Sequence, residues 1–293
     1  MPQGLNTAEH KKAFSIPAGP RHALPVILLL LLGFAAPLLA VIGFSLAPAK
    51  TFSLWQMPSL ENYVAIFDST NYISFLWSLT FAAMTVVILA LVCYPVAVGL
   101  VRVFGRWAMV MSLLFTIPLF VSENVRLYGW VLFYIKNGVL LGTLKSLFGL
   151  TPESWLFTHG IVLFGMVYVY LPFMLFPMTL GVGMVPADTR NAAYDLGASR
   201  WQVFREVDLP LSMPGIMIGF LLTFVLAVGA IAEAKVLGGQ RIIPVTHDIE
   251  ISFTYAQNWP MGSALSVLLM LVVGALVLVV LRRFDLDTIL GRK

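Results

Sequence analysis

We single out four ionisable residues that lie inside or near the ends of long apolar segments of this sequence: Glu123, Arg126, Glu233 and Lys235. An ionisable side chain at membrane depth costs about 2.5–3.5 kcal/mol or more, so such residues are candidates for contact with a charged ligand. Glu123 and Arg126 are three residues apart, close enough to pair on one face of a helix. Tyr128 and Trp130 follow them and complete the first candidate cluster.

The same residues also have an interpretation that involves no ligand. Tyr and Trp are enriched in the aromatic belts at membrane interfaces, where Trp130 would then lie. Long charged side chains extend their charged ends toward the interface while their stems stay in apolar surroundings. The sequence leaves both interpretations open for each of these residues.

A second chemistry-bearing stretch runs from Asn191 to Pro210 and is polar, with charges of both signs, between two apolar segments. Its periodicity predicts a short helix, in which Ala192, Ala193, Leu196 and Gly197 share a face. Pro186 and either Asp188 or Thr189 are the signals for its start. Gly197 is expected to end this helix in a left-handed conformation or to let another backbone approach. Pro210 is expected in the first turn of the next helix. An amphipathic connector lying on lipid headgroups is the alternative.

No arrangement of residues in the sequence predicts catalysis or cofactor binding. The four histidines are scattered without metal-ligand spacing, so no metal site is expected. The phosphate-binding string GxxxxGK followed by Ser or Thr does not occur, and neither does a GxSxG nucleophile elbow. The net charge of +4 comes without a dense basic block, which argues against nucleic acid as a partner. Cys93 is the only cysteine, so an intrachain disulfide is impossible.

The elements that must position these residues are membrane-spanning helices. Hydrophobic residues make up 59% of the chain and charged residues 11%, values typical of membrane proteins. A helix needs about 20 apolar residues to cross a bilayer. Six spans are predicted by this criterion: Ala23–Leu46, Tyr72–Val101, Trp107–Ile135, Trp155–Val185, Leu209–Ala232 and Gly262–Leu281. The third span contains Glu123 and Arg126, so either its end is polar or it breaks near Ser122.

Six spans put both termini on one side of the membrane, and the distribution of positive charge predicts that this side is the cytoplasm. Of the 18 Lys and Arg residues, the opposite side would hold Lys50, Arg126, Lys136, Lys145, Lys235 and Arg241, and the termini side all the others. We therefore expect cytoplasmic tails at residues 1–22 and 284–293. Between them lies one transmembrane domain, residues 23–283, whose loop 186–208 faces the cytoplasm. The first span is too long and uninterrupted for a cleaved signal peptide.

The loop resembles the cytoplasmic signature of ABC importer permeases, E-A-A-x3-G-x9-I-x-L-P. The matching string runs from Asn191 through Gly197 to Pro210 with every spacing kept, but Asn191 stands for Glu and Val207 for Ile. The resemblance implies a coupling helix that inserts into a groove of a separate ABC ATPase dimer, and hence no ATP hydrolysis by this chain. The residues implied in ATPase coupling are Asn191, Ala192, Ala193, Asp195, Gly197, Ala198, Arg200, Leu209 and Pro210.

Further stretches are similar to spermidine/putrescine-type permeases, namely SENVRLYGW (122–130), VYLPFMLFPM (169–178), LGG (237–239) and NWPMGSALSV (258–267). The resemblance implies an all-α, type I ABC importer permease fold in the bacterial inner membrane, in contact with membrane lipid. It also implies a second permease subunit, as a heterodimer, and an extracytoplasmic solute-binding protein. Ala230 and Lys235 stand where polyamine permeases commonly have acidic residues, which argues against a dication as cargo.

The sequence thus predicts one permease subunit of an ATP-driven importer for a polyamine-, opine- or amino-acid-derivative-like solute. A secondary transporter driven by an ion gradient is the first alternative, although no inverted repeat relates the two halves of the sequence. An intramembrane enzyme is the second alternative, and it lacks paired catalytic residues at usable spacing. Neither alternative requires the spacing kept between Asn191 and Pro210.

Overall fold

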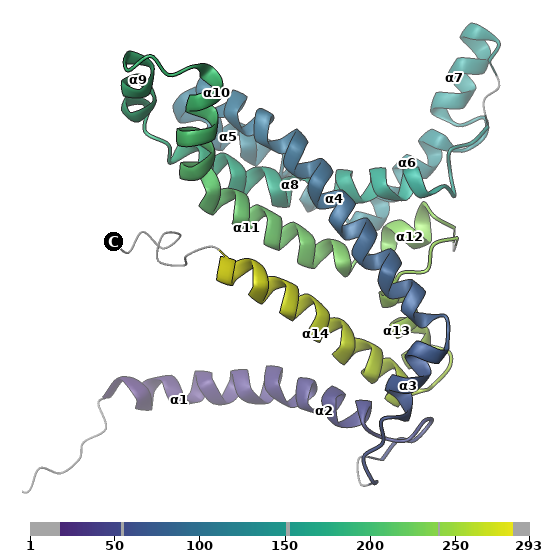
Figure 1. Cartoon of the computed structure of the whole chain (residues 1–293). Helices are drawn as coiled ribbons and strands as arrows, with labels where there is room; N and C mark the ends of the chain where they lie inside the picture. The colour runs from purple at the N-terminus through teal and green to yellow at the C-terminus, as the bar shows by residue number, and fades with distance from the viewer. Residues whose placement is uncertain (1–17, 54–55, 151–152, 240, 284–293) are drawn as a thin grey trace, which may run out of the picture.

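The computed structural model describes residues 18–53, 56–150, 153–239 and 241–283, and these residues form helices without strands (Figure 1). The predicted tail at residues 284–293 and most of that at residues 1–22 lie outside the described residues. In chain order the helices are α1 (Ala18–Leu30), α2 (Ala36–Ser45), α3 (Glu61–Asp68), α4 (Asn71–Gly99), α5 (Ala108–Leu114), α6 (Glu123–Tyr134), α7 (Val139–Phe148), α8 (His159–Gly183), α9 (Ala187–Asp195), α10 (Arg200–Val203), α11 (Leu209–Val228), α12 (Ala232–Val236), α13 (Val245–Thr254) and α14 (Trp259–Arg283).

The predicted all-α, polytopic fold with six spans is confirmed. Six helical stretches of the described chain are long and apolar enough to cross a membrane: Pro25–Ser45, Asn71–Phe120, Glu123–Phe148, His159–Gly183, Arg200–Val228 and Trp259–Arg282. The start of α1, the end of α14 and the short helices α9 and α10 lie toward one side in Figure 1, and α3, α12 and α13 toward the other. The even number of spans therefore brings both ends of the described chain to the side of α9.

Helix α8 is the centre of the packing. It lies against α4 and α11, and 61% of its most apolar stretch is buried inside the chain. The corresponding share is 0% for the span of α1 and α2 and 17% for that of α14. Side chains such as Leu29 and Phe34 are each 71% exposed. These outer spans need lipid or another chain to cover their apolar faces, because exposed apolar surface of this extent is unfavourable in water.

Two glycines let α8 and α11 cross with their backbones in contact. A Cβ atom added to Gly181 would lie 2.7 Å from the Cα atom of Gly215, and one added to Gly215 would lie 2.5 Å from the Cα atom of Gly181. Backbone atoms cannot move aside as a flexible side chain can. The crossing therefore requires glycine on both helices, as at other close helix pairs in membranes.

The third predicted span is broken, which decides between the two alternatives that the sequence left open. A short 3-10 turn at Ile117–Phe120 follows α5, and Val121 and Ser122 then have extended backbones with ψ values of 133° and 136°. Pro118 lies in that turn and lacks the N–H group that a continuous α-helix would use. Helix α6 consequently starts at Glu123, in the middle of the predicted span, with this carboxyl in its first turn.

We predict that Gly215→Leu destabilises the chain by about 1–3 kcal/mol, because the added side chain forces α8 and α11 apart. The measurement is the apparent melting temperature of the purified chain in detergent. Gly183→Ala is the matched control, since a methyl group at Gly183 in α8 meets nothing within 4 Å. An equal melting temperature for Gly215→Leu and the parent chain would show that the crossing tolerates separation.

Candidate functional site

Helix α9 forms the predicted short helix at the polar loop. It runs from Ala187 to Asp195 with Pro186 immediately before it. Gly197 then adopts the left-handed conformation, with φ of 84°. The Gly197 N–H group donates to the Tyr194 carbonyl at 2.9 Å, and the Ala198 N–H group donates to the Ala193 carbonyl at 3.0 Å. These two bonds form a Schellman motif and confirm the predicted left-handed end of the helix.

The loop turns most of its surface outward. None of the side chains of α9 is fully buried, and Leu196 beside Gly197 is 88% exposed. Of the residues implied in ATPase coupling, Ala193, Ala198 and Leu209 are half-buried, and the others are exposed: Asn191, Ala192, Asp195, Gly197, Arg200 and Pro210. Figure 1 shows α9 and α10 projecting together beyond the ends of α8 and α11. Loop 186–208 is thus an accessible projection, called the knob below, and its helix α9 has a well-defined end.

A single helix leads from this knob into the membrane. Ser199 and Gln202 form a capping box, with Ser199 N–H donating to Gln202 Oε1 at 2.8 Å and Gln202 N–H donating to Ser199 Oγ at 3.3 Å. The helix then runs unbroken to Val228 through a π-helical turn at Phe204–Asp208. Pro210 lies in the first turn of α11, as predicted, but this turn continues the helix that begins at Arg200.

A second site lies at the other end of the bundle, where α12 packs between α6 and α8. Glu233 of α12 has an exposure of 0%, and neither of its carboxyl oxygens has a hydrogen-bond partner among the described residues. A Cβ atom added to Gly165 of α8 would lie 3.7 Å from both Glu233 Cγ and Leu127 Cδ2 of α6. The carboxyl of Glu233 is therefore enclosed by three helices.

Burial raises the pKa of the Glu233 carboxyl from 4.5 to about 7, and the negative charge of Glu123 acts in the same direction. The Tyr170 hydroxyl and the positive charge of Arg126 act in the opposite direction. Tyr170 comes from α8 and is 6% exposed. At neutral pH the Glu233 carboxyl is thus close to the midpoint of its titration, where a small change in its surroundings changes its charge.

Glu123 and Arg126 both face this site but do not form the close pair that their spacing allowed. Among the described residues, no ion pair joins them. The Arg126 guanidinium instead lies 5.8 Å from the centre of the Tyr168 ring, and its Nε and Nη1 atoms are buried without hydrogen-bond partners. Glu233 and Arg126 therefore both keep unused hydrogen-bonding capacity, which is uncommon for buried polar groups.

Of the two aromatic residues predicted with this cluster, the structure places only Trp130 beside it. Trp130 packs in an aromatic group on α6 and α8, with ring centres 5.4 Å from Tyr168 and 4.8 Å from Phe164. Tyr128 is 59% exposed on the outside of α6. Trp130 thus supports the ring that carries Arg126, whereas Tyr128 is not part of the polar cluster.

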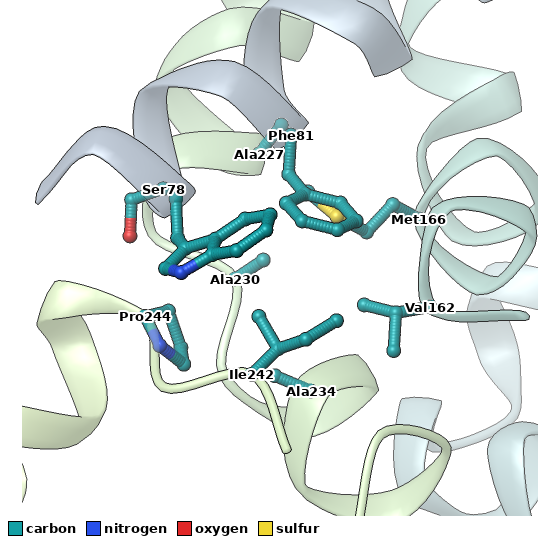
Figure 2. Close-up of a pocket in the computed structure, with 10 residues that line it drawn as sticks. Ser78, Phe81, Val162, Met166, Ala227, Ala230, Ala234, Ile242 and Pro244 are labelled. Carbon is teal, nitrogen blue, oxygen red and sulfur yellow. The ribbon is translucent and has the colours of Figure 1, made fainter. Parts of the chain in front are cut away.

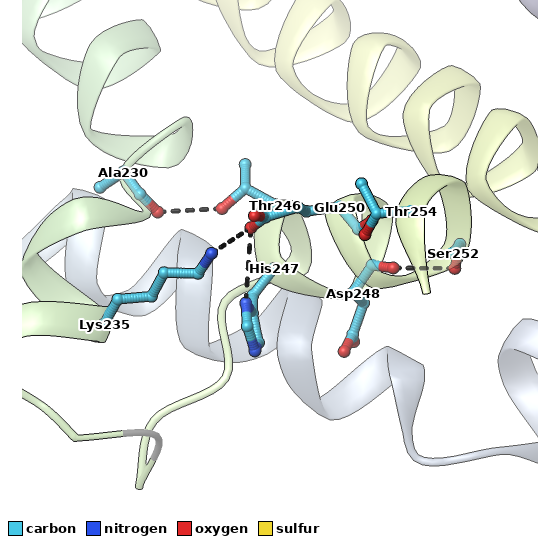
Figure 3. Close-up of polar contacts among 8 residues, drawn as sticks. All are labelled: Ala230, Lys235, Thr246, His247, Asp248, Glu250, Ser252 and Thr254. Atoms are coloured by element: carbon cyan, nitrogen blue, oxygen red, sulfur yellow. Dashed lines mark hydrogen bonds and ion pairs between the residues drawn. The ribbon is translucent and has the colours of Figure 1, made fainter. Parts of the chain in front are cut away.

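Lys235 is exposed and belongs to a separate network that joins α12 to α13 (Figure 3). Its Nζ atom contacts Glu250 Oε2, and His247 Nδ1 lies 3.7 Å from the same oxygen. The Lys235 ammonium beside Glu250 lowers the pKa of that carboxyl. In the same network Thr246 Oγ1 donates to the carbonyl of Ala230 at 2.9 Å. Because Glu250 neutralises Lys235, this lysine is not a free positive charge that would repel a cationic cargo.

A small pocket between α4, α8 and α12 is too confined for a solute (Figure 2). Its free volume is about 20 Å³, room for roughly one water molecule. Apolar side chains line most of it, including Trp77, Phe81 and Met166. Ala230 lies on its wall, and Ser78 Oγ accepts the Val245 N–H group at 2.9 Å. The charged groups that a solute would need lie outside this pocket.

The sequence interpretation missed three residues that matter to these sites. Tyr170 was hidden within an apolar run, where no charged letter marked it. Asp208 is 5% exposed and forms an ion pair with Arg102, whose Nη2 atom lies 2.5 Å from Asp208 Oδ2. An acidic residue directly before an apolar span was the available signal for Asp208. Glu250 had no local signal, because its partner Lys235 comes from another helix.

Comparison with known proteins identifies the family of this chain. Residues 84–287 match the family described as the binding-protein-dependent transport system inner membrane component. The spermidine/putrescine transport system permease protein PotB of Haemophilus influenzae is 32% identical over 260 residues, covering 88% of this chain and 90% of that protein. The PotB protein of Escherichia coli is 31% identical over 250 residues, covering 83% of this chain and 89% of that protein.

A solved structure has the same fold. The bacterial ABC transporter involved in import of the acidic polysaccharide alginate contains a chain that superposes with a TM-score of 0.73 at 17% identity, over 90% of this chain and 93% of that chain. At this identity the likeness concerns the fold alone. With the family match and the PotB relatives, it makes this chain a multi-pass inner membrane transport subunit and not an enzyme. The chain belongs to the binding-protein-dependent transport system inner membrane component family of ABC importer permeases.

Proposed function

We propose that this chain forms one half of the membrane pathway of an ATP-driven importer for a small charged or polar solute, of polyamine, opine or amino-acid-derivative type. The observation that carries the proposal is α9, an accessible helix without a buried side chain that ends at left-handed Gly197. A helix of this kind is suited to insertion into a groove of another protein. The groove belongs to a separate ABC ATPase dimer on the cytoplasmic side.

In this proposal the ATPase moves α9, and α9 moves the membrane helices between outward-open and inward-open states. The helix that starts at Arg200 and continues to Val228 links the knob directly to the membrane interior. Loop 186–208 and both termini are then cytoplasmic, in agreement with the excess of Lys and Arg on that side. Residues 23–283 act as one transmembrane domain.

Two further partners complete the pathway. A second, related permease subunit covers apolar faces such as those of α1 and α2, whose span buries 0% of its apolar stretch within this chain. An extracytoplasmic solute-binding protein delivers the cargo on the side of α12 and α13. The alginate transporter has been solved in complex with an alginate pentasaccharide-bound periplasmic protein, and its matching chain has a TM-score of 0.73 at 16% identity.

The polar cluster favours a cationic cargo. Glu123 and Glu233 supply two carboxyls against the single guanidinium of Arg126, so the cluster is net negative when both carboxyls are ionised. Aromatic faces beside it, such as that of Tyr168, attract cations. The names of the PotB relatives include spermidine and putrescine. The neutralisation of Lys235 by Glu250 removes the main argument against a diamine.

A secondary transporter is the second candidate, because a buried carboxyl with a pKa of about 7 is the type of group that a proton-coupled carrier uses. The two candidates differ in their energy source. We predict that uptake by the complete transporter in sealed vesicles stops on ATP depletion and persists when ionophores abolish ion gradients. The measurement is accumulation of radiolabelled putrescine, with spermidine and an opine as competing solutes. Uptake that follows the gradient and ignores ATP would establish the secondary transporter.

We predict that Gly197→Trp lowers ATP-driven uptake at least about tenfold, the effect of a loss of roughly 1.4 kcal/mol in the coupling contact. Gly197→Ala is the matched control. Both side chains impose the same left-handed strain, and a Cβ atom at Gly197 meets nothing within 4 Å in this chain. A larger loss with Trp than with Ala therefore reports bulk against the ATPase. Equal uptake by the two variants would refute contact at this position.

We predict that the stability of the chain falls as the pH rises from about 5 to about 8, because a carboxyl whose pKa is raised on folding favours the folded state only while protonated. For Glu233 this contribution is complete below the ordinary pKa of 4.5 and lost as the pH passes about 7. Its size is on the order of 3 kcal/mol, at roughly 1.4 kcal/mol for each pKa unit.

Glu233→Gln, which mimics the protonated carboxyl, should keep the higher stability across this range. The measurement is the apparent melting temperature of the purified chain in detergent at each pH. Glu250→Gln is the control, since removal of this carboxyl should leave the fall between pH 5 and pH 8 in place. A Glu233→Gln variant with the same pH dependence as the parent chain would mean that another group titrates.

A further inference from the structure

Helix α9 has one side-chain ion pair with the rest of the described chain. None of its side chains is fully buried, so apolar packing does not hold it to the bundle. Arg190 and Ala193 are the two half-buried residues of this helix, and the Arg190 side chain is 17% exposed. The Arg190 Nη1 atom lies 3.8 Å from Asp208 Oδ1, at the start of α11. A movement of α9 relative to the membrane helices must therefore act on this contact.

Asp208 is fixed on its other side. Its Oδ2 atom is 2.5 Å from Arg102 Nη2, in the π-helical extension of α4 at Leu100–Phe104. Close by, the ring of Tyr94 in α4 lies 5.7 Å from that of Phe204, in the π-helical turn that precedes α11. Asp208 thus ties α4 to α11 firmly, while its contact with α9 is longer.

The two carboxyl oxygens of Asp208 differ in their hydrogen bonding. Oδ1 is buried and has no hydrogen-bond partner among the described residues. A buried polar atom left without a partner is unfavourable, because it has lost its hydrogen bonds to water without replacement. An approach of Arg190 by about 0.9 Å would bring its nitrogen to hydrogen-bond distance. Asp208 Oδ1 therefore favours a closer approach of the Arg190 guanidinium, which a movement of α9 toward α11 would provide.

We propose that Asp208 is the joint through which movement of α9 reaches α4 and α11, with Arg190 as the positioning residue on the moving side. This inference rests on the proposed function, since it assumes that an ATPase moves α9. It adds residues outside the family signature: within the matched string, Asp208 occupies the unspecified position between Val207 and Leu209. Motion of α9 then reaches the membrane helices by two routes, through the Arg190–Asp208 ion pair and through the continuous helix that starts at Arg200.

The test uses the complete transporter, with its ATPase, partner permease and binding protein, reconstituted in sealed vesicles. Solute uptake and ATP hydrolysis are measured together, because their ratio reports coupling and a loss of folded protein lowers both equally. Arg190→Gln should keep ATP hydrolysis within about twofold and lower uptake per ATP about tenfold, a change of roughly 1.4 kcal/mol in the coupled state. Arg190→Lys, which keeps the charge, should restore most of this ratio.

Arg205→Gln is the matched control, since Arg205 is an exposed arginine of the same segment and has no ion pair among the described contacts. It should leave the ratio unchanged. Asp208→Asn should lower the ratio at least as much as Arg190→Gln, because it weakens the contacts of this carboxylate with both Arg190 and Arg102. Adding Arg190→Gln to Asp208→Asn should cause no further loss, because the Arg190–Asp208 contact is already removed. If Asp208→Asn does not assemble, Arg190→Gln and Arg190→Lys still decide the question.

Two outcomes overturn the inference while the proposed function stands. The first is an unchanged ratio of uptake to ATP hydrolysis in Arg190→Gln, and the second is a fall of equal size in Arg205→Gln. Uptake by the unaltered transporter that does not depend on ATP would instead refute the proposed function itself. The two failures are therefore distinguishable in one set of vesicles.

Discussion

The backbones of α8 and α11 touch at Gly181 and Gly215, and the rest of the structure depends on this contact. The two helices are consecutive spans, so their crossing determines where the connection between them projects, and that connection is α9. Because α12 follows α11 directly, the same crossing brings Glu233 against Gly165 at the opposite end of α8. One close approach between glycines thus positions both candidate sites.

Ionisable side chains are accommodated in three ways along this chain. Asp208 is compensated by Arg102, and protonation compensates the enclosed Glu233, whose pKa is raised to about 7. Lys235 stays exposed and pairs with Glu250. In the first and third arrangements the charged group has an oppositely charged partner within the chain. Glu233 and Arg126 keep polar atoms without partners, and a site that changes its ligand during a cycle has to keep such atoms available.

Helices α8 and α9 differ in burial and therefore in how easily they can move. Helix α8 buries most of its apolar stretch and cannot shift without disturbing the core. Helix α9 buries no side chain fully, so its position depends on its two chain connections and on the Arg190–Asp208 contact. A weakly held element beside a rigid core can be moved by an external protein at low cost in stability.

The sequence by itself determined the spans, the short helix that ends at Gly197 and the alternative of a break at Ser122. Each of these follows from local properties, namely apolar length, the left-handed conformation that glycine tolerates, and charged residues inside an apolar segment. Tertiary structure alone decided that Arg102 meets Asp208 across 106 positions, that Glu250 neutralises Lys235 and that Tyr170 lies beside Glu233. Such contacts depend on how the helices cross, because side chains distant in sequence come together only when backbones pack, and no local pattern encodes that geometry.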